Sequence, residues 1–181
     1  MTKLALGIVL VSAIATLGDY VWYEIGVRHR MIAGIIHGAV LLMSVGGVLG
    51  WPARRVGVGL QTGIGAGVVG ALTYYAMAPT MGYPAMFAAW VVVWLLLAYG
   101  EGRILSRPQR PWLTLLTRGV IAAALSGVAF YAISGTVWGR PPAGGRNYLQ
   151  HFVAWIVAWA PGLIAIGWPR RSTGAPGNSR R

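Results

Sequence analysis

The sequence predicts an all-α protein, a polytopic transmembrane bundle of six helices. Hydrophobic residues make up 56% of the 181 residues and charged residues only 10%, and the mean hydropathy is +0.63. A soluble domain of this size is less apolar. The apolar residues fall in charge-poor runs of about 20 residues, the length that a helix needs to cross roughly 30 Å of hydrocarbon.

Six such runs fit the chain and leave only short connections. Proline and glycine, which end helices readily, separate them at Pro52, at Pro79 with Pro84, at Pro108 with Pro111, and in the stretch 141–145. We therefore expect one helical domain over residues 1–168 and a disordered, basic, cytoplasmic tail over 169–181. The expected spans are residues 4–23, 31–50, 56–77, 85–100, 112–133 and 148–168.

The first run has a second interpretation. Lys3, the apolar residues 4–11 and the pair Ala13 and Ala15 also match a secretory signal peptide. Cleavage after Ala15 would leave five spans. An uncleaved helix is favoured because apolar residues continue to Leu17 and the following aromatic residues suit a membrane interface.

Lysine and arginine predict the orientation. One face of the bundle receives ten of them, namely Lys3, Arg54, Arg55, Arg103, Arg107, Arg110, Arg170, Arg171, Arg180 and Arg181, and the opposite face four, namely Arg28, Arg30, Arg140 and Arg146. Basic residues accumulate on the cytoplasmic side, so both termini are expected there. The chain contains more arginine than lysine and is rich in glycine and alanine. This composition is typical of high-GC bacterial genomes and favours a bacterial inner membrane.

Composition also argues against several functions. A net charge of +12 would suit nucleic-acid binding in a soluble protein, but these charges flank apolar runs, where lipid headgroups and topology account for them. The glycines of residues 57–67 lie within a membrane-length run rather than in a phosphate-binding loop. Because the chain has no cysteine, it offers no thiolate nucleophile and no cysteine metal site.

Glycines predict a close helix contact. Gly59, Gly63 and Gly67 recur every four residues in the third run, and small residues at this spacing let helix backbones approach closely in lipid. The second run carries a similar face with Gly34, Gly38, Gly46 and Gly50. We expect the second and third helices to be neighbours.

The few ionisable residues inside the spans are the candidate functional groups, because such groups are costly in lipid. Asp19, His37 and His151 come from three different spans and lie at a similar depth in the outer leaflet half. Further polar candidates at this depth are Tyr20, Tyr75, Asn147 and, at the rim, Arg146. On the opposite side, Glu101 is expected to form a structural ion pair, with Arg118 or Arg103 as its partner.

Three classes of function fit these residues. The favoured one is transport or binding of an ion or small polar solute at an outward-facing polar site, with proton exchange available to aspartate and histidine. The alternatives are a structural or assembly subunit, in which oligomerisation through helix faces is open, and a membrane enzyme or metalloprotein that binds metal or haem through His37 and His151. No compact metal motif such as HExxH is present, and the sequence identifies no catalytic residue, cofactor or metal.

Overall fold

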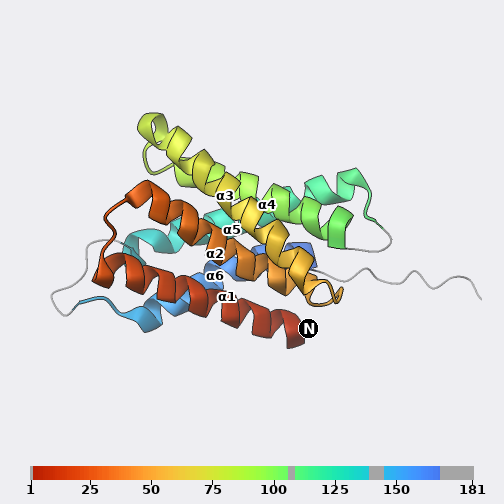
Figure 1. Cartoon of the computed structure of the whole chain (residues 1–181), viewed down its shortest axis with the longest axis horizontal. Helices are drawn as coiled ribbons and strands as arrows, with labels where there is room; N and C mark the ends of the chain where they lie inside the picture. The colour runs from red at the N-terminus through yellow and green to blue at the C-terminus, as the bar shows by residue number, and fades with distance from the viewer. Residues whose placement is uncertain (1, 106–108, 139–144, 168–181) are drawn as a thin grey trace, which may run out of the picture.

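A computed structural model describes residues 2–105, 109–138 and 145–167, and the regular secondary structure in these ranges is entirely helical (Figure 1). The elements are α1 (Thr2–Tyr20), η1 (Val21–Ile25), α2 (Arg30–Gly50), α3 (Val56–Met81), α4 (Ala85–Tyr99), η2 (Gly100–Leu105), α5 (Trp112–Val137) and α6 (Tyr148–Gly167). Counting each π-helical turn with the helix before it, six helices are long and apolar enough to cross a membrane. The predicted all-helical fold and the number of long apolar helices are confirmed. The expected tail and most of the stretch 141–145 lie outside the described residues.

The six helices form a closed ring in chain order. Each packs against the next, and α1 packs against α6 to close the ring, while α4 also reaches across to α6. Successive helices alternate in direction (Figure 1). One end of the bundle therefore gathers the ends of α1, α3 and α5 and the beginnings of α2, α4 and α6; we call it the Asp19 end, and the opposite end the Arg110 end.

The closest helix contact joins α2 and α3. A Cβ atom at Gly59, Gly63 or Gly67 would overlap the backbone carbonyl of Gly46, Leu42 or Gly38, respectively. The predicted glycine face thus lies against α2, and its lack of side chains is what allows the two backbones to touch.

Tryptophans fill the middle of the ring. The rings of Trp90 and Trp94 on α4 meet Trp159 on α6, with centroids 4.8 Å and 5.7 Å from it. Trp94 and Trp159 are fully buried. The outward faces of the helices carry large apolar side chains instead, for example Leu113 and Val128, which are 72% and 67% exposed.

The third helix continues past its predicted end, and both it and the sixth helix contain a proline. The third was expected to stop at residue 77, before Pro79, but α3 continues to Met81 with Pro79 inside it. A proline removes one backbone donor, and so near a helix end it disturbs little; here Gly82 N still donates to Ala78 O at 2.8 Å. In α6, the turn at Pro161 is supported by Ser126 of α5, whose Oγ accepts a bond from Gly162 N at 3.0 Å.

Each of the two π-helical turns carries an acidic residue. Glu24 lies in η1 and Glu101 in η2. Such turns are rare and often occur at functional sites. The first one ends at Gly26, whose φ of +78° belongs to the left-handed region that glycine adopts without strain.

Candidate functional site

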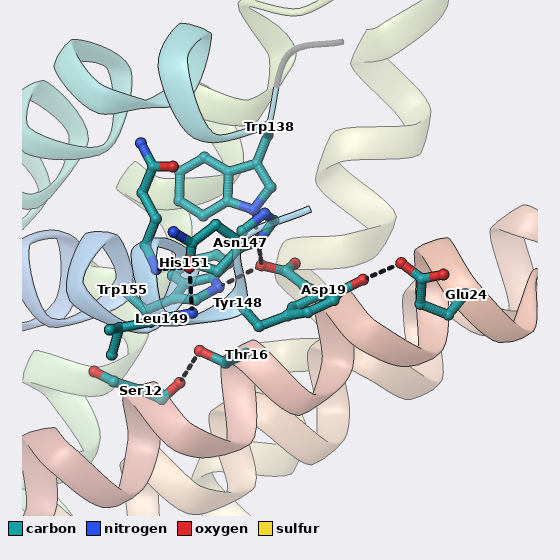
Figure 2. A network of polar contacts seen from close by, with 11 residues as sticks. Ser12, Thr16, Asp19, Glu24, Trp138, Asn147, Tyr148, Leu149, His151 and Trp155 are labelled. Atoms are coloured by element: carbon teal, nitrogen blue, oxygen red, sulfur yellow. Dashed lines mark hydrogen bonds and ion pairs between the residues drawn. The ribbon is translucent and has the colours of Figure 1, made fainter. Parts of the chain in front are cut away.

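Asp19 is the centre of a buried polar cluster at the Asp19 end of the bundle (Figure 2). It lies in the last turn of α1 and is 8% exposed. Its Oδ2 atom contacts Nδ1 of His151 at 2.7 Å and accepts hydrogen bonds from Nε1 of Trp138 and of Trp155, both at 2.8 Å. The carboxylate therefore ties α1 to α5 and α6.

Two indole N–H groups donate to one oxygen of this carboxylate, and hydrogen bonds to an ionised oxygen are stronger than those to a neutral one. If the Nδ1 atom of His151 is protonated, it is the third donor, whether the imidazole is neutral or cationic. All three bonds go to Oδ2, and within the described residues no bond is made to Oδ1. The second oxygen is thus available to another group.

A cavity of about 570 Å³ opens beside this carboxylate. Asp19 and His37 both line it, together with small residues of α2 and α3 such as Gly38 and Gly67. Its walls are chiefly aromatic, with Trp22, Tyr23, Tyr74, Tyr75, Tyr83, Trp90, Phe130, Trp138, Trp155 and Trp159 contributing. The volume lies within the range of about 300–1,000 Å³ that is usual for small-molecule sites.

His37 and His151 have different environments. His151 is 2% exposed and bound to Asp19. The ring of His37 lies against the backbone of Gly18, next to Asp19, and meets Trp22 edge-on at 6.5 Å between centroids. His37 is half-buried, and its ring forms no hydrogen bond with a described residue, so it is the histidine that a molecule in the cavity would meet.

The other predicted site residues mostly support the fold. Tyr20 packs edge-on against Tyr148, with centroids 5.4 Å apart. Asn147 begins α6, its Oδ1 accepting bonds from Leu149 N and Gln150 N at 3.1 Å and 3.2 Å, as helix-capping side chains do.

Tyr75 and Arg146 lie closer to the cavity. Tyr75 lines it and donates its hydroxyl to Arg30 O at 2.7 Å. The guanidinium of Arg146 lies 3.5 Å from the ring centroid of Tyr23, a cavity residue. Beside them, Tyr148 donates to Glu24 at 2.7 Å, which binds η1 to α6 (Figure 2).

At the Arg110 end, Glu101 has a partner that the sequence did not suggest. Glu101 is bound by Arg110, whose Nε and Nη2 atoms donate to the two carboxylate oxygens at 2.9 Å and 3.0 Å. Arg118 instead donates to Ile166 O at 2.7 Å and joins α5 to α6. The reason is local: Arg110 N bonds to Gly102 O at 2.9 Å, which holds the chain after η2 beside Glu101.

Sequence reasoning missed both indoles that bind Asp19. Trp138 follows the fifth apolar run, where an interfacial position is the usual expectation for a tryptophan. A signal did exist, since His151, Trp155 and Trp159 recur every four residues and so share one face of α6.

Fold and site together define a six-helix bundle with long apolar helices and a central aromatic cavity that carries one buried carboxylate. Among the described residues there is no group of three or more histidine, aspartate or glutamate side chains placed to hold a metal ion. Neither protein-family models, nor curated proteins, nor solved structures give a match to this chain.

Proposed function

We propose that this chain is an integral membrane protein that binds a small organic solute in the cavity at its Asp19 end and takes part in the transport of that solute. The observation that carries the proposal is the Asp19 carboxylate, which lies in the wall of a 570 Å³ aromatic cavity with one oxygen held by three nitrogen atoms. A buried charge supported in this way is costly to build and commonly marks function.

Membrane insertion is supported by the surface of the bundle. Each of the six helices is long and apolar enough to cross a bilayer, and large apolar side chains face outward where a soluble protein would carry charges. The excess of Lys and Arg around the Arg110 end favours placing it in the cytoplasm. The cavity would then open toward the periplasm of a bacterial inner membrane.

An uncleaved first helix fits this proposal. The residues before the candidate cleavage point include Val11, Ser12 and Ala15, which are fully buried in the bundle. Cleavage after Ala15 would remove most of the helix that positions Asp19 between α2 and α6. We therefore favour six spans over five.

The lining favours an organic solute over a hydrated inorganic ion. Aromatic faces bind apolar and cationic groups, whereas a hydrated ion needs many polar ligands to replace its water. Oδ1 of Asp19 and the ring of His37 supply a small number of polar contacts within an apolar wall, as in typical small-molecule pockets. The best-suited solute has an apolar body and a cationic or hydrogen-bond-donating group.

Binding can be tested with benzyltrimethylammonium, a cation with one aromatic ring, and with neopentylbenzene, its neutral counterpart of the same shape. Five cavity residues are tryptophans, so occupancy should change the intrinsic fluorescence of the protein in detergent. We expect saturable binding of the cation, with affinity about tenfold lower in Asp19→Asn, corresponding to roughly 1.4 kcal/mol. Glu24→Gln is the matched control and should change the affinity less than twofold.

The two probes separate the parts of the proposal. Equal affinity of the cation for wild type and Asp19→Asn would show that the carboxylate does not contribute to binding. If neither probe bound saturably to folded protein, the cavity would not be a solute site. Uptake of the bound probe into proteoliposomes, lost in Asp19→Asn, then distinguishes transport from binding alone.

A further inference from the structure

A second cavity, at the Arg110 end, carries unused hydrogen-bonding capacity. Its volume is about 450 Å³, and it lies between the beginning of α1, the end of α2 and the segment that follows η2. Leu4, Val48, Leu49 and Leu105 supply apolar walls, while Arg55, Glu101 and Arg110 supply charge. This cavity is separate from the one at Asp19, which forms at the opposite end of the same helices.

Arg110 is the critical residue. It is only 6% exposed, and Glu101 uses its Nε and Nη2 atoms. Its Nη1 atom is buried and has no hydrogen-bond partner among the described residues. A buried guanidinium nitrogen without an acceptor is costly, because the hydrogen bonds it made to water are not replaced. Arg110 lines the adjacent cavity, so an acceptor bound there within reach of Nη1 would remove this cost.

The charge of the cavity favours an anionic acceptor. Arg55 also lines it, and this side chain is positioned by a bond from its Nη1 atom to the backbone oxygen of Ile104. Two arginines against the single carboxylate of Glu101 leave an excess of one positive charge. Because Glu101 is already bound by two nitrogens of Arg110, it repels an incoming anion less than a free carboxylate would.

We propose that the Arg55–Arg110 cavity binds a phosphate group. Guanidinium groups match phosphate oxygens in geometry and charge, and two arginines on one cavity wall are a common phosphate-binding arrangement. The apolar walls beside them suit the glycerol and upper acyl chain of an anionic lipid, and free phosphate shares the same recognised group. Recognition of phosphate is independent of the proposed solute site, whereas a lipid source rests on the proposed membrane insertion.

The test uses the full chain, purified in detergent and stripped of lipid. Thermal unfolding and native mass spectrometry are followed with phosphatidylglycerol, with diacylglycerol of the same acyl chains, and with inorganic phosphate. We expect phosphatidylglycerol to bind and raise the melting temperature and diacylglycerol to do neither. Stabilisation by inorganic phosphate to the same degree would identify free phosphate as the source.

Variants locate the site. Arg55→Gln should weaken binding of the phosphate-bearing probe at least tenfold, whereas Arg54→Gln, its exposed neighbour with the same loss of charge, should change it less than twofold. Arg110→Lys keeps the charge but removes the Nη1 donor and should also weaken binding. If Arg110→Lys does not fold, the result for Arg55→Gln alone tests the proposal. Equal weakening by Arg54→Gln and Arg55→Gln, or no preference for phosphatidylglycerol or phosphate over diacylglycerol, would overturn the proposal.

Discussion

Asp19 shows what can be predicted about a residue from its depth in the membrane, counted along its span, and what cannot. Counting residues along the spans placed Asp19 and His151 at one level, and the structure brings them to 2.7 Å. Depth says nothing about rotation around a helix axis, however, so the indoles of Trp138 and Trp155 were not predicted as partners. His37 shares the level but faces the cavity instead of binding the carboxylate.

The first prediction concerns the charge of Asp19. Asp19→Asn removes an ionised acceptor shared by three nitrogen atoms, and we expect the free energy of unfolding to fall by about 1–3 kcal/mol. Denaturation in detergent measures this effect. Glu24→Gln, which alters one exposed bond to Tyr148, is the control; equal unfolding free energies for wild type and Asp19→Asn would contradict the prediction.

The second prediction compares two buried tryptophans. Trp155→Phe removes a donor to Asp19, whereas Trp94→Phe removes an Nε1 atom that is buried with no partner among the described residues. Both variants lose the same ring volume, so the difference between them isolates the hydrogen bond. Trp155→Phe should be more destabilising by roughly 1–2 kcal/mol, measured by denaturation of the two variants under the same conditions. Equal losses would show that the bond to Asp19 adds no net stability.

At the scale of single helices, the predictable features were those that depend on composition alone. Apolar length gave six helices, and the glycine spacing of the third gave its contact with α2. The π-helical turns that carry Glu24 and Glu101 were not predicted; these side chains bind Tyr148 and Arg110, contacts that apolar length and residue spacing do not reveal. The continuation of α3 through Pro79 likewise depends on where in the helix the proline falls.

The third prediction tests the α2–α3 contact. In Gly63→Leu the new side chain would meet the backbone of Leu42 and Met43, which cannot move aside without separating the helices. We expect a loss of about 1–3 kcal/mol or more in unfolding free energy, typical of overpacking. Gly65→Leu is the matched control in the same helix, since nothing lies within 4 Å of a Cβ atom there. Comparable melting temperatures for the two variants would refute the role of the glycine face.

For the whole molecule, the closed ring explains why the two cavities occur at opposite ends. Tryptophans from α4 and α6 pack together in the middle, and the two cavities lie toward the Asp19 end and the Arg110 end. Ring closure could not be predicted from the sequence, because it depends on α1 returning to α6 across more than a hundred residues. From the sequence, polar side chains were expected only to share one depth at this end. In the structure, two of them, Asp19 and His37, line the same cavity.

The last prediction concerns orientation, which decides on which side each cavity opens. The chain contains no cysteine, so single cysteines can be introduced into an unmodified background. His29 precedes α2 at the Asp19 end, and Ala53 lies between α2 and α3 at the Arg110 end; both are exposed. With Lys and Arg concentrated around Ala53, we expect a membrane-impermeant thiol reagent to label His29→Cys in intact spheroplasts and Ala53→Cys only after lysis. The reverse pattern would place the Asp19 cavity on the cytoplasmic side, and labelling of both sites in intact spheroplasts would contradict a helix α2 that crosses the membrane.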